Sequence, residues 1–263
     1  MPSAMRRSIQ YRNFRNDARR RLVTLRHHFR PRHWTDADPC KVIFLNPTSI
    51  RYATRITPEW QARYRCTDGE AVRFTWHHFH KLDAAGRALA GDWDRLFESY
   101  EANKTYRLIV ERYGRCMPWR ETAVFREFVE TIERGEAVWH DCSSIVELKR
   151  RCDAIDRLFV DIRDRGYRPQ SEFRHTDRRA QLDEIVVNID REGGFLYNSS
   201  GSHRLSIAKV LGIDAVPVRI LVRHREWQDL RNRIRSGSRA SAETASPVPQ
   251  FGHPDLADAI KGR

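Results

Sequence analysis

Short apolar blocks recur along the chain, and their spacing predicts strands at both ends of the sequence. Residues 41–45 form a short apolar run that is followed by Asn46-Pro47, which predicts a buried strand and a turn. Residues 185–189 are mostly β-branched, 192–194 are turn-forming and 195–197 are apolar again, which predicts a β-hairpin. A last apolar run at 216–222 predicts a closing strand.

Between these strands, residues from about 96 to 165 show the three- and four-residue apolar spacing of helices. The stretch 123–132 has this period and is followed by Gly135. Ser144 precedes Glu147 by three residues, which is a capping-box signature for a helix that continues to Gly166. Because most of the helical spacing lies in one block between the predicted strands, the pattern predicts an α+β fold.

Composition adds information about partners. The chain has 263 residues, 40% hydrophobic and 32% charged, so it is long enough and apolar enough to form a core. Its formal net charge is +13, and only 6 of 48 basic residues are lysine. A positive field rich in arginine favours anionic partners such as nucleotides, nucleic acid or acidic lipid, although solvated surface arginines would give the same composition.

No apolar run is long enough to cross a bilayer, which excludes a membrane-spanning protein. Five cysteines without a CxxC pair, and no secretory apolar segment at the start, predict a cytoplasmic protein.

The first 37 residues are predicted to be a basic amphipathic arm. Residues 1–33 contain ten arginines and a single acid, Asp17, and apolar residues recur at helical spacing between Tyr11 and Phe29. Such a helix, covering residues 6–30, fits contact with DNA phosphates, an anionic membrane surface or the protein's own domain. The sequence leaves these three alternatives open.

The unit with the most chemical information is the predicted bend between the hairpin and a helix at about 203–211. Gly201 and Ser202 are small residues at a helix N-terminus, where backbone N–H groups and the helix dipole favour an anion. His203 and Arg204 add a titratable donor and a forked cation for a phosphoryl group. An ordinary serine N-cap followed by a solvated arginine is the alternative.

An ordered series of segments resembles the ParB/sulfiredoxin fold. The series consists of a helix ending at 162–167, a strand at 183–187, the G-x-x-R loop at 201–204 and a closing "lG…vPv" strand at 211–218. The resemblance covers residues 143–223 and, more weakly, 40–50. It implies a domain at 38–235 with a largely helical insertion at about 95–142. Beyond residue 235 the chain is low in apolar residues, so 236–263 is predicted to be a flexible, disordered tail.

The resemblance implies a nucleotide site, because the family's G-x-x-R loop binds nucleotide phosphates. The predicted nucleotide-binding residues for ATP, CTP or ADP are Gly201, Ser202, His203, Arg204 and Gln170. Ser202 stands where sulfiredoxin has its reactive cysteine, so sulfinic acid reduction is not expected. The acidic loop residue and the following helix-turn-helix of partition proteins are also absent from this sequence, which argues against partition activity.

Three carboxylates are candidate ligands for a nucleotide-bound Mg²⁺. Asp92 and Asp94 flank a tryptophan after a glycine, and Glu184 begins the strand that precedes the loop. A helix start or a solvated strand end would explain the same acids without a metal. The leading hypothesis is a nucleoside-phosphate-binding protein, with phosphoryl transfer or nucleotide hydrolysis as its chemistry if it is an enzyme. A non-catalytic DNA-binding protein and a peripheral membrane protein, both acting through residues 6–30, are the alternatives.

Overall fold

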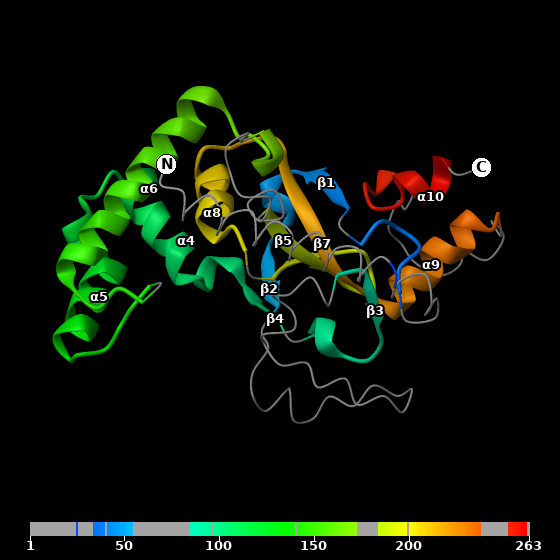
Figure 1. Ribbon diagram of the computed structural model, residues 1–263, viewed down its shortest axis with the longest axis horizontal. Helices are drawn as coiled ribbons and strands as arrows, with labels where there is room; N and C mark the ends of the chain where they lie inside the picture. The colour runs from blue at the N-terminus through cyan, green and yellow to red at the C-terminus, as the bar shows by residue number, and fades with distance from the viewer. Residues whose placement is uncertain are drawn as a thin grey trace, which may run out of the picture.

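A computed structural model of the chain has an α+β fold with a seven-stranded mixed sheet (Figure 1). This confirms the predicted fold class at the level of α+β. The strands run in the order β1-β7-β5-β6-β2-β4, with β3 paired to β7. The structure describes residues 25, 34–39, 41–54, 85–95, 97–139, 141–172, 184–198, 200–237 and 252–261.

The long strand β7 (Val216–His224) organises the sheet. Strand β5 (Ile185–Ile189) runs parallel to it along one edge. The other edge is shared by β1 (Val42–Leu45), which is antiparallel to the first half of β7, and β3 (Arg87–Leu89), which is parallel to the second half. Every residue of β5 and β7 is buried, as the continuous apolar runs in the sequence predict for central strands.

Three short strands complete the sheet beyond β5. Strand β6 (Phe195–Tyr197) is antiparallel to β5 and forms the predicted hairpin with it. Next to β6 lies the parallel strand β2 (Tyr52–Thr54), and β4 (Phe97–Ser99) pairs antiparallel with β2 at the edge. The predicted helical insertion at about 95–142 therefore also contributes a strand to the sheet.

The helices between β4 and β7 in the sequence lie on one side of the strands and extend away from them, and the helices after β7 lie on the other side (Figure 1). Helix α8 contacts both α4 and α6, and α5 packs against α4. The side chain of Ser144 accepts a hydrogen bond from the Glu147 amide, so α6 begins at the predicted cap. The bounds of these helices are α4 (Lys104–Ile109), α5 (Ala123–Glu133), α6 (Ile145–Arg165) and α8 (Ser202–Val210).

The C-terminal residues differ from the predicted flexible tail at 236–263. Helix α9 (Arg225–Arg235) is followed, after residues that lie outside the described part, by a docked segment at 252–261 that ends in α10 (Ala257–Lys261). Leu256 and Ala259 join the main hydrophobic core, and Asp255 is fully buried. We refer to residues 252–261 as the C-terminal segment. The C-terminal segment has few apolar residues and is held largely by buried ion pairs. Its hydropathy therefore does not predict that it docks.

The predicted basic arm lies almost entirely outside the described residues, so its three alternatives stay predictions. Within the described part of the chain, none of the helices combines the length and the apolar character needed to span a membrane.

Candidate phosphate-binding site

The predicted bend between strand and helix is present at the N-terminus of α8. Gly201 is the N-cap residue, with φ of 79° and ψ of 21°, a left-handed conformation that favours glycine. A side chain at this position would bring its Cβ 2.9 Å from Cγ1 and 3.0 Å from Cα of Ile185. No side chain caps α8 at Gly201. The bend therefore lies directly on the beginning of β5 and presents the first turn of a nine-residue helix.

Three of the predicted site residues meet beside this first turn. The backbone amide of Gln170 donates to Oε1 of Glu184 (2.7 Å), and Nη1 of Arg204 lies 3.6 Å from the other carboxylate oxygen. The side chains of Glu184 and Arg204 are 2% and 12% exposed. At this burial the carboxylate largely neutralises the guanidinium, so Arg204 is held in place by an internal anion.

A buried tyrosine fixes the first turn from the opposite side. The Tyr100 hydroxyl donates to the Ser202 carbonyl (3.2 Å) and lies 3.1 Å from Oγ of Ser206. Burial raises the pKa of Tyr100 well above its ordinary value, so the hydroxyl stays protonated. The ring also lies under Nζ of Lys209, 5.4 Å from the centroid. Tyr100 thus links two successive turns of α8 to the β4 end of the sheet.

His203 faces the helical side of the molecule. Its ring centroid lies 5.2 Å from the ring of Trp139, which in turn stacks on Phe128. Trp139 has a φ of 37°, which is unusual for a residue with a side chain. The loop between α5 and α6 therefore reaches the first turn of α8, and this aromatic contact borders the candidate site.

Asp92 and Asp94 lie in a different cluster. The guanidinium of Arg191 donates to Asp94 through Nε (2.8 Å) and Nη2 (2.7 Å), and Nη2 also donates to Asp92 (2.8 Å) and to the Gly91 carbonyl (2.9 Å). Burial raises the pKa of Asp94, but the Arg191 hydrogen bonds outweigh it, so the net effect is a lowered pKa. These carboxylates hold the hairpin turn through a cation that the protein itself supplies.

Of the alternative candidate metal ligands, Asp92 and Asp94 therefore lie in one cluster and Glu184 lies in another. Among the residues that the structure describes, no cluster of three or more histidine, cysteine or acidic side chains is placed to hold a metal ion. Arg191 already occupies the acidic positions of the turn, and Arg204 and the Gln170 amide occupy Glu184. The geometry gives these carboxylates structural partners, and we derive no step through Mg²⁺.

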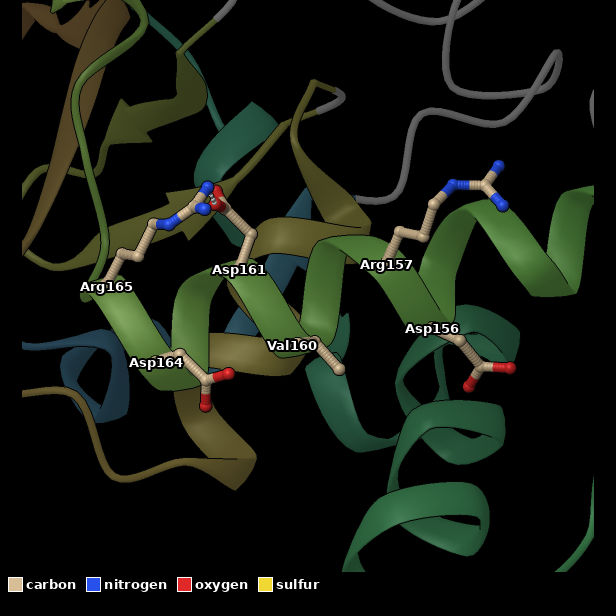
Figure 2. A pocket seen from close by; sticks show the side chains of 6 residues that line it. All are labelled: Asp156, Arg157, Val160, Asp161, Asp164 and Arg165. Carbon is tan, nitrogen blue, oxygen red and sulfur yellow. Dashed lines mark hydrogen bonds and ion pairs between the residues drawn. The ribbon is translucent and has the colours of Figure 1, made fainter.

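A surface pocket of about 530 Å³ lies along α6 (Figure 2). Its described lining residues all come from this one helix, and Asp161 and Arg165 form an ion pair of 2.7 Å within it. Acidic and basic groups alternate along the pocket, so it presents no single charge to a ligand. The lining residues are Asp156, Arg157, Val160, Asp161, Asp164 and Arg165.

Tyr100, Trp139 and Arg191 were not predicted as site or partner residues. Each acts through a contact with a distant part of the chain, and local spacing carries no signal for such contacts. The chain matches no family model, no curated protein and no solved structure. The resemblance to the ParB/sulfiredoxin fold accordingly rests on the sequence segments named above.

Proposed function

We propose that the protein binds a nucleoside phosphate, with ATP, CTP and ADP as the candidate ligands, at the first turn of α8. The observation that carries the proposal is the Gly201 bend, which places a helix N-terminus with a glycine as its N-cap residue beside the Arg204 guanidinium. Residues Gly201, Ser202, His203 and Arg204 would contact the phosphates. Phosphoryl transfer or nucleotide hydrolysis is the chemistry that such a site would serve, because both depend mainly on positioning and charge neutralisation.

In this proposal, Glu184 is the internal competitor of the ligand. The carboxylate lies 3.6 Å from Arg204 and is anchored by the Gln170 amide. A multiply charged phosphate would compete with one carboxylate for the guanidinium fork. The negative charge of Glu184 would repel the same ligand. The affinity for the ligand then depends on how far its attraction to Arg204 exceeds two opposing effects, the attraction of Glu184 to Arg204 and the repulsion of the ligand by Glu184.

Two variants that successively remove the charges of Glu184 and Arg204 test the proposal. Glu184→Gln keeps an oxygen for the Gln170 amide and removes the opposing charge, so we expect nucleotide or tripolyphosphate to bind about tenfold more tightly. Adding Arg204→Met to this variant removes the cation without leaving a buried carboxylate unpaired, and we expect binding to be lost. The measurement is ligand-induced thermal stabilisation, which reaches about 2.7 kcal/mol at a hundred times the dissociation constant.

Arg126→Met on the exposed face of α5 is the matched control and should bind like the wild type. The proposal is wrong if no nucleotide or polyphosphate stabilises the wild type, or if the double variant binds as tightly as Glu184→Gln alone. Titrations with and without Mg²⁺ test the metal hypothesis separately. Loss of a Mg²⁺-dependent increment in Glu184→Gln would assign this carboxylate to the metal and would contradict its role as a competitor.

Tyr100→Phe provides a second test, of how the first turn is held. This change removes the hydroxyl that bonds to the Ser202 carbonyl and to Ser206, while the ring keeps its packing. We expect a loss of about 1–2 kcal/mol in the free energy of unfolding, together with weaker nucleotide binding. Urea denaturation and thermal shift measure the two effects. Tyr106→Phe is the control, since its ring packs on Tyr100 and no contact of its hydroxyl is seen within the described residues. Equal effects of both variants would show that the hydroxyl contacts are unimportant.

A further inference from the structure

The C-terminal segment is attached to the domain partly through one histidine. The Asp255 amide donates to Nδ1 of His253 (3.2 Å), and Nε2 of the same ring lies 3.0 Å from the Gly193 carbonyl. The ring also stacks on Phe195 with centroids 4.9 Å apart and meets Trp227 edge-on at 4.5 Å. His253 therefore bridges its own segment to the hairpin turn and to α9.

Only the neutral imidazole satisfies both polar contacts. Nδ1 must be an acceptor, because its partner is a backbone N–H, and Nε2 must carry the proton, because its partner is a carbonyl. A second proton on Nδ1 would place two donors against each other and remove the cap from the first turn of the segment. Protonation of His253 thus opposes docking by geometry alone.

The charged groups around the His253 ring have opposite effects on its protonation. Asp255, on the same segment, favours the protonated ring, whereas Lys41 at the start of β1 and Arg223 on β7 oppose it. Asp255 is itself committed to Arg223, through bonds of 2.9 and 2.6 Å. Burial, with smaller contributions from Lys41 and Arg223, lowers the pKa of His253. The pKa of Asp255 lies far below its usual range because these cations outweigh the effect of burial, so Asp255 stays ionised where histidine titrates.

We propose that residues 252–261 form a pH-operated latch, which docks while His253 is neutral and is released as this ring takes up a proton. Release uncovers the side chains of Arg223 and Arg231, which are both 0% exposed when the segment is docked. It also frees the Trp227 indole, whose N–H donates to Asp255 (3.0 Å). Lowering the pH therefore exposes two guanidinium groups that are buried while the segment is docked.

The direction of the pH effect follows from the difference between the pKa values of His253 in the released and the docked segment. The released ring has an ordinary histidine pKa, near 6.5, and the docked ring has a lower one. Docking is therefore fully favourable above about pH 6.5 and weakens as the pH falls from there toward the docked pKa. Each pH unit within this window changes the docking equilibrium by up to about tenfold.

Hydrogen exchange of the intact chain tests the latch. Amide protection in residues 252–261, corrected for intrinsic exchange and compared with α6, should fall by up to about tenfold between about pH 7.5 and pH 5.5. His253→Asn keeps a cap acceptor that does not titrate, so its segment should show the same protection at both pH values. Asp255→Asn removes the ion pairs and should lower protection at both pH values while the pH dependence remains.

Two results would overturn the latch. Protection that stays constant across this range in the wild type would show that protonation does not release the segment. A pH dependence that persists in His253→Asn would assign the effect to another group. If His253→Asn fails to fold, the ring proton of wild-type His253 followed by NMR gives the same decision, because release with protonation requires the ring and segment signals to change at one midpoint.

Discussion

Asp255→Ala is expected to lower the free energy of unfolding by about 3–5 kcal/mol, the cost of breaking a buried ion pair on one side. Asp255 and Arg223 are both 0% exposed, and two hydrogen bonds of 2.9 and 2.6 Å join them. The same carboxylate accepts from Trp227 and lies 3.5 Å from Nη1 of Arg231. Its removal leaves two buried guanidinium groups with less negative charge than the fold provides. Urea denaturation measures the loss.

Asp258→Ala is the control for this effect. Asp258 contacts Lys41 (2.6 Å) and Arg231 (3.0 Å), but its side chain is 44% exposed, so its loss should cost about 1 kcal/mol or less. Arg231 also keeps Asp36, which accepts from its Nε at 2.9 Å. A similar cost for Asp255→Ala and Asp258→Ala would show that solvent reaches the Arg223 site and that the pair is not buried in solution.

The docking of the C-terminal segment shows where hydropathy fails as a guide. Arg223, Arg231 and Asp255 each carry the pattern of surface residues, and only their mutual pairing makes burial possible. A local pattern predicts burial from apolar side chains, and it has no means to pair charges across 24 or 32 positions of the chain. The sequence therefore predicted a flexible tail where the structure has a docked segment.

The elements predicted well are those with a long local signal. Helix α6 has many residues in register with one period, β5 and β7 are continuous apolar runs, and the short β6 is predicted through the turn that joins it to β5. Strands β2, β3 and β4 have three residues each, which is too short to show alternation. They become strands because neighbouring strands offer them hydrogen bonds, which is a tertiary effect.

The same distinction applies to the candidate site. The bend at Gly201 and the helix that follows it could be predicted from adjacent residues. The contact of Glu184 with Arg204 could not, and it gives this candidate metal ligand a cationic partner within the protein. Asp92 and Asp94 were likewise predicted as ligands, but their partner Arg191 lies nearly a hundred positions away. Residue types were predictable here, and their pairing was not.

Gly201→Ala is expected to destabilise the protein by about 3 kcal/mol and to abolish nucleotide binding. A left-handed conformation costs an alanine about 1–2 kcal/mol, and the added Cβ would also meet the Ile185 backbone at 3.0 Å, a clash worth a similar amount. Because the obstacle is backbone, the bend must move, and the first turn of α8 would move with it relative to Glu184.

Gly212→Ala separates these two costs. Gly212 follows the other end of α8 with a φ of 65°, and an added Cβ there would meet nothing within 4 Å. It should therefore pay only the conformational cost, about 1–2 kcal/mol, and leave ligand binding unchanged. Urea denaturation and nucleotide-induced stabilisation, measured on both variants, give the comparison. If Gly201→Ala is no more harmful than Gly212→Ala, the bend has room to adapt. The close approach of α8 to β5 would then contribute nothing to the geometry of the proposed phosphate site.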